Sequence, residues 1–293
     1  MSTIGIVNGT EIGEALVARL STDGRKVISG VDASAFRRIG TETRLVLVDA
    51  RRSDLVRVLR ELGAYLDPNH LVVHTVNGLG AEGSATALIE AESPVRRTGV
   101  LAGPLLVSAL RGGRPTAAVI ASRHPEVVEE FADALSTPRL RVYRSRDPLG
   151  VELCASLAEL AVLACGMSDA LELGAAARAL LIVRCVRELG RIMTAVGGDP
   201  VTATGLAGLG DILVRSVDDT ALSYQVGRKL ALGGAAEGPA LEVLRGTAVR
   251  LAALNKAHRV SAHVFEGLAA LLGGKIAPSA LVEQLMTVRV LDE

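Results

Sequence analysis

The chain has 293 residues, which is long enough for one large domain or two ordinary ones. Hydrophobic residues make up 49% of it and aromatic residues only 2%, so its core must be built mainly from Ala, Val and Leu. Lys and Arg number 32, as do Asp and Glu, and the formal net charge is zero. Without a basic field or Trp side chains for base stacking, the composition argues against nucleic-acid binding.

No apolar run approaches the roughly 18 residues that a membrane span needs, since the longest candidate, LAELAVLACGM, is interrupted by Glu159. The N-terminus has no basic stretch followed by an apolar core, so we expect no signal peptide and a cytoplasmic protein. The cysteines, Cys154, Cys165 and Cys185, lie in apolar helical sequence without a CxxC pattern or a nearby His. We therefore expect buried free thiols and no metal site.

In chain order, the first half alternates short apolar runs with helical stretches. Strands are predicted in KVISGVD and over residues 3–7, 45–49, 70–76, 98–104, 116–122 and 140–145. Helix-period spacing predicts helices at GEALVARLS, RSDLVRVLRELGAYL and HPEVVEEFADALS, the last with Pro in its first turn. Repeated strand–helix units indicate an α/β fold with a Rossmann-like, doubly wound, mostly parallel sheet.

The pattern changes near residue 149, and no convincing strand follows. Long apolar helices are predicted in VELCASLAELAVLACGMSDALELG and AARALLIVRCVRELGRIMTAVG, with shorter ones to the end of the chain. We expect a Rossmann-like, dinucleotide-binding-type domain over residues 1–148. An all-helical domain of the substrate-binding or dimerisation type is expected over residues 149–293.

The first strand, turn and helix, IGIVNGTEIGEALVARL, have the layout of a dinucleotide-binding fingerprint, but the turn reads NGTEIG where GxGxxG is expected. Asn8 tolerates the positive φ of the first glycine position, and Gly13 keeps the helix-packing glycine. Thr10 takes the second position, where its side chain intrudes on the pyrophosphate path. Glu11 adds an anion at a helix N-terminus, which the helix dipole stabilises and a phosphate avoids. The turn is expected to fold and to bind NAD(P) weakly or not at all.

The second half carries a specific resemblance. GVELCASLAELAVLACGMSDALELG, GGDP and TGLAGLGDIL resemble the C-terminal domain of the bacterial NAD(P)-dependent glycerol-3-phosphate dehydrogenases, and LAGPLLVSALRGGRPTAAVIAS is similar to the SGP[ST]FA…GxPT segment of that family. The match runs in order from about residue 96 to residue 232. The resemblance implies hydride transfer between a nicotinamide and dihydroxyacetone phosphate or glycerol 3-phosphate, and usually a homodimer.

Most of the residues that the resemblance implies for catalysis are replaced here. The family's main catalytic Lys aligns with Ala158, and its second Lys aligns with Asn77. The Arg and Asn that hold the substrate phosphate align with Leu222 and Ser223. A phosphate ester carries about −1.5 to −2 charges at pH 7 and needs cations or helix N-termini in a water-poor site. The losses therefore argue against phosphate-ester oxidation.

Three carboxylates are the candidate catalytic residues: Asp211, which stands at a retained family position in GLAGLGD, Glu159, which aligns with a family Asn, and Asp49, which aligns with a turn Pro. Since Asp211 is kept and Glu159 gained, the site is expected to have moved towards negative charge. Each has a structural alternative: an N-cap for Asp211, a helix carboxylate in a polar environment for Glu159, and a cap of the helix in RSDLVRVL for Asp49. His74, beside Asn77, is interpreted as a hydrogen-bonded edge histidine.

The candidate cofactor-binding positions, all in degenerate surroundings, are Asn8, Gly9, Thr10, Gly13, Gly103 and Glu242. The leading interpretation is a catalytically degenerate relative of the dehydrogenases, a pseudoenzyme with a binding, regulatory or assembly role that keeps the homodimer. The alternative is a repurposed NAD(P)-dependent oxidoreductase acting on a non-phosphorylated carbonyl or alcohol. An ordinary glycerol-3-phosphate dehydrogenase would require that these residues are misaligned. Any other small-molecule or protein partner is left open.

Overall fold

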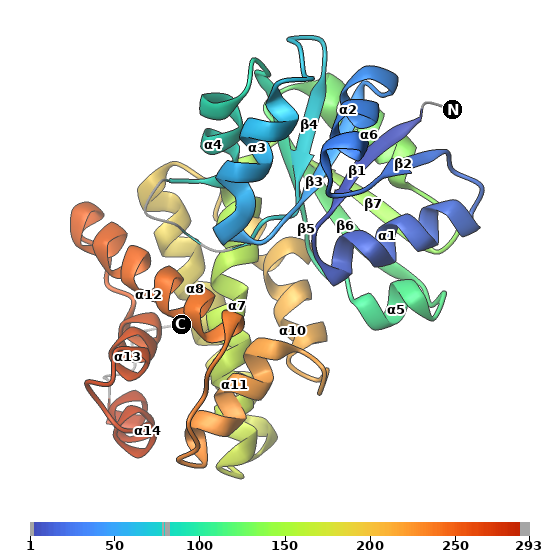
Figure 1. Ribbon diagram of the computed structural model, residues 1–293. Coiled ribbons are helices and arrows are strands. Elements are labelled where there is room, and N and C mark those ends of the chain that lie inside the picture. The colour runs from blue at the N-terminus through green and yellow to red at the C-terminus, as the bar shows by residue number, and fades with distance from the viewer. Residues whose placement is uncertain (1–2, 78, 80–82, 288–293) are drawn as a thin grey trace. The chain divides into compact units, whose positions relative to one another are not determined.

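The computed structural model describes residues 3–77, 79 and 83–287 (Figure 1). The described chain divides into two compact units. Unit 1 runs to Glu152 and holds a seven-stranded sheet. Unit 2 comprises Leu79 and residues 153–287 of the described chain, which the structure places in helices and loops.

The sheet of unit 1 has the strand order β2-β1-β3-β4-β5-β6-β7. Its strands are β1 (Ile4–Asn8), β2 (Val27–Ser29), β3 (Leu45–Asp49), β4 (Leu71–His74), β5 (Arg97–Ala102), β6 (Thr116–Ala121) and β7 (Leu140–Ser145). Every neighbouring pair is parallel except β5 and β6, which are antiparallel. The predicted doubly wound, mostly parallel α/β sheet is confirmed.

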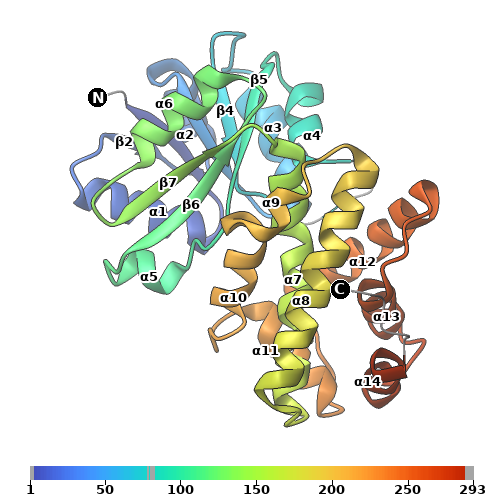
Figure 2. The same cartoon turned by 180° about the vertical axis from the view of Figure 1, so that it is seen from behind.

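Helices cover both faces of this sheet, as the opposite views of Figures 1 and 2 show. They are α1 (Glu11–Thr22), α2 (Ala33–Glu42), the short 3-10 helix η1 (Arg52–Asp54), α3 (Leu55–Gly63), α4 (Ala85–Glu92), α5 (Val107–Arg111) and α6 (Pro125–Leu135). One buried cluster joins α1, α5 and α6 to the strands, and a second joins α2, α3 and α4 to the other face. Burial on both faces explains why the central strands are almost continuously apolar.

Unit 2 is helical, as predicted. Its helices are α7 (Pro148–Ala170, which begins in unit 1), α8 (Gly174–Val196), α9 (Val201–Thr204), η2 (Leu206–Gly210), α10 (Asp211–Arg215), α11 (Leu222–Ala231), α12 (Pro239–His258), α13 (His263–Leu272) and α14 (Pro278–Thr287). Helix α7 is long and apolar enough to cross a membrane, which the sequence analysis did not anticipate. Since 89% of its most apolar window is buried inside the protein, α7 is a core helix.

Helices α7 and α11 cross at two glycines. A Cβ atom at Gly166 would lie 2.2 Å from the carbonyl oxygen of Tyr224, and one at Gly227 would lie 2.0 Å from that of Leu163. Neither helix could therefore carry a side chain at its crossing glycine without moving its neighbour. This close approach places Ser223, in the first turn of α11, beside the middle of α7.

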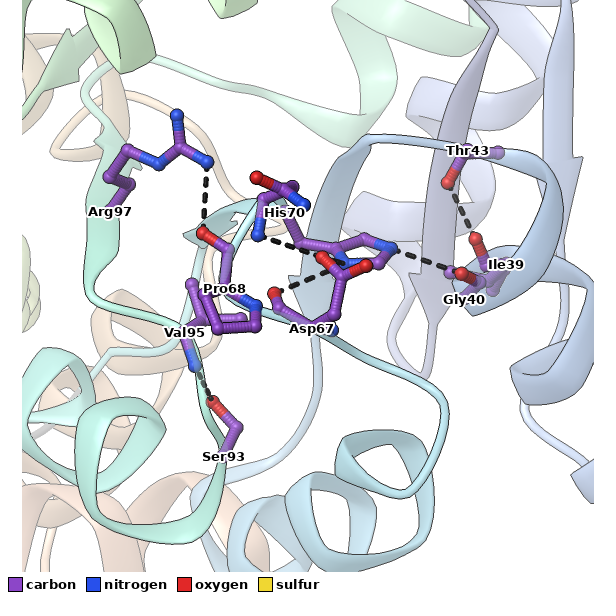
Figure 3. A network of polar contacts seen from close by, with 10 residues as sticks. Ile39, Gly40, Thr43, Asp67, Pro68, His70, Ser93, Val95 and Arg97 are labelled. Carbon is purple, nitrogen blue, oxygen red and sulfur yellow. Dashed lines mark hydrogen bonds and ion pairs between the residues drawn. The ribbon is translucent and has the colours of Figure 1, made fainter.

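A polar network fixes the segment before β4 (Figure 3). The Nε2 atom of His70 lies 3.0 Å from the carbonyl oxygen of Gly40, and its Nδ1 atom lies 2.9 Å from the backbone nitrogen of Asp67. Arg97 donates to the carbonyl oxygen of Pro68 at 2.9 Å. Because ligands of such sheets bind beyond the carboxyl ends of the strands, this network at the amino end of β4 is a structural one.

Candidate functional site

The turn after β1 closes against the end of β3. Parallel pairing sets Asn8 opposite Asp49, and the backbone N–H of Gly9 donates to the carbonyl oxygen of Asp49 at 2.8 Å. The side chain of Asp49 therefore points towards the first turn of α1, which begins two residues after Gly9. The sheet topology thus brings a carboxylate to the place where a fingerprint loop of this fold would face a dinucleotide phosphate.

The Asp49 carboxylate accepts four hydrogen bonds there, and the residue is only 2% exposed. Its Oδ1 atom accepts from the hydroxyls of Thr10, at 3.0 Å, and Thr75, at 2.6 Å. Its Oδ2 atom accepts from the backbone N–H groups of Thr10, at 2.8 Å, and Gly13, at 3.1 Å. The Thr10 hydroxyl in turn accepts from the N–H of Ile12 at 3.2 Å, as the N-cap of α1. Donors that a helix normally leaves free at its start are satisfied from within the chain.

Two interpretations made from the sequence need correction. Asp49 does not cap the helix in RSDLVRVL, because α3 has Asp54 at its N-cap position and no side-chain cap bond. Glu11 is not the anion that meets the α1 amides, since its side chain is 75% exposed and lies 3.7 Å from Arg111. That anion is Asp49, whose carboxylate is aligned with the helix dipole. Thr10 serves the turn as a cap and a donor.

The glycines of the turn fit this arrangement. A Cβ atom at Gly13 would lie 2.4 Å from Oδ2 of Asp49 and 2.8 Å from the Cα atom of Asn8. A Cβ atom at Gly9 would lie 2.9 Å from the carbonyl oxygen of Asp49. Asn8 has a buried side-chain oxygen without a hydrogen-bond partner. Gly13 thus leaves the room that the Asp49 carboxylate fills.

The two remaining candidate cofactor positions lie elsewhere in the fold. Gly103 follows β5 with a φ of 101°, a conformation that favours glycine, and Leu105 behind it packs into the core of unit 1. Glu242 lies in the first turn of α12 in unit 2, where its side chain is 72% exposed and 3.6 Å from Arg245. An exposed ion pair of this kind contributes little to stability.

In unit 2, the candidate carboxylates Glu159 and Asp211 are brought together by Arg215. Its Nη2 atom lies 2.6 Å from Oε1 of Glu159, and its Nη1 atom lies 3.3 Å from Oδ2 of Asp211. The second oxygen of Glu159 accepts from the hydroxyl of Ser223. The carboxylates lie on α7 and α10, and we call these four residues the Arg215 group.

Burial dominates the electrostatics of the Arg215 group. Asp211 is 3% exposed, and its Oδ1 atom has no hydrogen-bond partner. Burial raises the pKa of Asp211 to about 6, with the charge of Glu159 adding to the rise and Arg215 opposing it. The two carboxylates together raise the pKa of Arg215, although its burial acts the other way, so the guanidinium stays charged.

Arg215 also changes the expected charge of this site. Asp211 and Glu159 were expected to move the site towards negative charge, and Arg215, which lies within hydrogen-bond reach of both, offsets one of these two charges. Asp211 is not an N-cap either, since Gly210 holds that position of α10. The signal that could have revealed the ion pair is the i,i+4 spacing of Asp211 and Arg215.

Three neutral residues, which the resemblance was expected to align with cationic groups, differ in exposure. Ala158 is fully buried within α7, and Asn77 is half-buried. Leu222, at the start of α11, is 64% exposed. Because it is so exposed, the side chain of Leu222 does not fill a buried site in unit 2. Leu105, in contrast, is only 9% exposed and packs into the core of unit 1.

His74 belongs to a buried hydrogen-bond chain at the carboxyl end of β4. Its Nδ1 atom accepts from the N–H of Val76 at 3.2 Å, which assigns the proton to Nε2, 3.1 Å from the hydroxyl of Thr86. Thr86 donates to Oε2 of Glu152 at 3.0 Å, and the N–H of Ala85 donates to Oε1 at 2.5 Å. Because β4 lies between β3 and β5, His74 is a central rather than an edge histidine.

The three cysteines lie in buried positions, as predicted. Burial raises the pKa of the Cys165 thiol to about 12. A thiol with so high a pKa is a poor nucleophile at neutral pH. Within residues 3–77, 79 and 83–287, no three His, Cys, Asp or Glu side chains are arranged to hold a metal ion.

Comparison with known proteins assigns this chain to a family. The model of the NAD-dependent glycerol-3-phosphate dehydrogenase C-terminus matches residues 147–283. A glycerol-3-phosphate dehydrogenase (NAD(P)+) of Synechococcus sp. (strain JA-2-3B'a(2-13)) is 34% identical over 295 residues, covering 98% of this chain and 84% of that protein. The chain belongs to the glycerol-3-phosphate dehydrogenase family. The resemblance inferred from the second half of the sequence is thereby confirmed.

Other relatives agree with this assignment. A glycerol-3-phosphate dehydrogenase (NAD(P)+) of Sinorhizobium fredii is 35% identical over 210 residues, which cover 71% of this chain and 63% of that protein. The crystal structure of glycerol-3-phosphate dehydrogenase from Coxiella burnetii superposes with a TM-score of 0.85 at 23% identity, covering 98% of this chain and 99% of that one. That likeness shows a shared fold: a Rossmann-like sheet followed by a helical domain.

Proposed function

We propose that this chain is a glycerol-3-phosphate dehydrogenase-like protein that does not oxidise glycerol 3-phosphate and that keeps the fold for a binding, regulatory or assembly role. The observation that carries the proposal is the Arg215 group. Arg215, a buried cation of unit 2, is held by Glu159 and Asp211, two carboxylates of the same unit. A cation bound in this way is not available to a phosphate.

Reduction of a ketone by hydride transfer also needs a group that stabilises the developing oxyanion and supplies a proton. Ala158, at the position that aligns with the main catalytic Lys, can do neither. Arg215 cannot replace that Lys as a proton donor, because a guanidinium does not lose its proton in proteins. With Glu159 and Asp211 ionised, the Arg215 group carries a net negative charge, which opposes a phosphate dianion.

The cofactor of the family, NAD(P), does not fit the fingerprint turn of this chain. The amides of the first turn of α1 that would meet a phosphate are taken by Asp49 and Thr10. We therefore propose that NAD(P) binds weakly or not at all, and that the chain forms a homodimer or a complex with another partner.

A direct assay tests the proposal. Purified protein is mixed with NADPH or NADH and dihydroxyacetone phosphate, with the Synechococcus relative as a positive control. We expect no oxidation of the cofactor that depends on dihydroxyacetone phosphate. Loss of each catalytic group typically costs at least about 10²-fold in rate, so several losses together should bring turnover below detection. Turnover near that of the relative would overturn the proposal.

A second candidate function is favoured by Asp211 alone. A buried carboxylate with a pKa of about 6 is suited to general acid–base catalysis near neutral pH. It would serve an NAD(P)-dependent oxidoreductase that acts on a non-phosphorylated alcohol or carbonyl. This candidate requires measurable nicotinamide binding, and Asp211→Asn should abolish its turnover. Full activity of that variant would exclude Asp211 as the acid–base group.

A further inference from the structure

We propose that Asp49 is the residue that keeps dinucleotides off this protein, by acting as an internal anion at the N-terminus of α1. The inference deepens the proposed function, on which it rests, by assigning the loss of cofactor binding to one side chain. The class of ligand excluded is a phosphate or pyrophosphate group, as found in NAD(H) and NADP(H).

Asp49 uses the whole hydrogen-bonding capacity of its carboxylate. A carboxylate has about four acceptor positions, and here each oxygen accepts from two donors. Two of those donors, the N–H groups of Thr10 and Gly13, belong to the start of α1. A phosphate at a helix N-terminus is held by N–H groups of this kind, so it would have to displace Asp49 to gain them.

The carboxylate of Asp49 has no room in which to move aside. It is buried, and it fills the space beside Gly13, where even a methyl group would lie 2.4 Å from Oδ2. Its backbone is fixed by the pairing of β3 with β1 and by the bond from Gly9. Thr75, which follows β4, donates a further hydrogen bond to Oδ1 at 2.6 Å.

The charge of Asp49 also opposes a phosphate at the N-terminus of α1. The N-terminus of a helix behaves as roughly half a positive charge, which one buried carboxylate already balances. A pyrophosphate beside it would bring like charges together in surroundings that screen them poorly. Glu11, although nearer in sequence, cannot exert the same effect because its side chain is exposed and solvated. Exclusion therefore depends on Asp49 and not on the acidic residue within the turn.

The test compares two charge-removing variants, Asp49→Ser and the matched control Glu11→Gln. NADPH is titrated and its fluorescence is recorded, which is straightforward because the chain has no Trp. We expect Asp49→Ser to bind NADPH at least about tenfold more tightly than the unmodified protein, and Glu11→Gln to bind no more tightly than it. Equal affinity for Asp49→Ser and the unmodified protein, or an equal gain in both variants, would overturn the inference.

Asp49→Ser removes four hydrogen bonds and is expected to lower the stability of the protein. A second measurement therefore detects ligand binding through its effect on stability. Melting temperature is followed against the concentration of inorganic pyrophosphate, because a ligand stabilises the state that binds it. The melting temperature should rise with pyrophosphate in Asp49→Ser, and stay constant in the unmodified protein and in Thr75→Val, which loses one of the four hydrogen bonds but keeps the carboxylate at the α1 amides. A flat response in Asp49→Ser, or an equal rise in Thr75→Val, contradicts the inference. Turnover of dihydroxyacetone phosphate by the unmodified protein would instead contradict the proposed function, so the two failures are distinct.

Discussion

Two buried aspartates of this protein have opposite surroundings. Asp49 receives four hydrogen bonds, whereas Asp211 shares one cation with Glu159 and has an oxygen without a partner. A buried carboxylate gains stability from donors and loses it when they are missing. Asp49 therefore suits a structural role, and Asp211 is held in its ionised form at a cost in stability.

This cost predicts that Asp211→Asn stabilises the protein. A folded-state pKa of about 6, above the ordinary value of 3.8, means that the folded state favours the protonated acid. The stability that protonation contributes is present below about pH 4 and is lost as the pH rises through 6. An Asn removes this loss, so we expect the free energy of unfolding at pH 8 to rise by about 1–3 kcal/mol.

Urea unfolding of both proteins between pH 4 and pH 8 measures the effect. The difference between Asp211→Asn and the unmodified protein should grow with pH and level off above pH 7. Glu61→Gln, which removes an exposed carboxylate of α3, is the control and should change stability by less than about 0.5 kcal/mol. A destabilised Asp211→Asn at pH 8 would show that the ion pair with Arg215 outweighs the burial of the carboxylate.

At the scale of single residues, the sequence predicted which side chains are candidates better than it predicted which groups they contact. Asp211, Glu159 and Asp49 were all singled out, but Arg215 was missed. Its i,i+4 spacing from Asp211 is visible in the sequence, whereas its contact with Glu159 depends on helices α7 and α10 lying side by side. The contact of Asp49 with α1 depends on β3 pairing with β1. That neighbour relation follows from the doubly wound topology, so this contact could have been predicted.

At the scale of elements, the crossing of α7 and α11 controls the Arg215 group. Gly227→Ala would place a methyl group 2.0 Å from a backbone oxygen of α7, which cannot give way as a side chain can. We expect the variant to lose about 1–3 kcal/mol of stability, as is typical of overpacked interiors. Gly246→Ala is the matched control, because that glycine of α12 has no neighbour within 4 Å.

The control should move in the other direction. Replacing an unhindered helical glycine by Ala stabilises a protein by about 0.4–1 kcal/mol, mainly by restricting the unfolded chain. Thermal unfolding followed by circular dichroism compares the two variants with the unmodified protein. If both substitutions had the same effect, the α7–α11 contact would not be the close approach that the structure shows.

The elements themselves differed in how well the sequence predicted them. The strands were found because burial on both faces leaves continuous apolar runs, and α7 and α8 because they are long. Helices α2, α4 and α5 were missed: they have 10, 8 and 5 residues and too few apolar positions to reveal a period. The antiparallel pairing of β5 and β6 has no local signal, because it depends on how the chain returns to the sheet.

At the scale of the whole molecule, the two units contain buried groups that respond to acid in opposite ways. In unit 1, burial lowers the pKa of His74, with Arg52 acting in the same direction and Glu152 against it. In unit 2, burial raises the pKa of Asp211 and of Glu188, although Glu188 accepts bonds from the first turn of α13. Folded unit 1 thus disfavours the protonation of His74, whereas folded unit 2 favours the protonation of Asp211 and Glu188.

The direction in which stability changes with pH follows from the difference between the pKa values of the folded and the unfolded chain. Because folded unit 1 holds His74 neutral, it loses stability as the pH falls below the ordinary value of 6.5. Folded unit 2 gains stability as the pH falls through 6, since Asp211 takes up its proton before the unfolded chain does. Hydrogen exchange between pH 7 and pH 5, corrected for the intrinsic rate, should show protection falling around β4 and rising around α10. In His74→Gln the trend around β4 should disappear while that around α10 persists, and parallel trends in the two units of the unmodified protein would contradict this assignment.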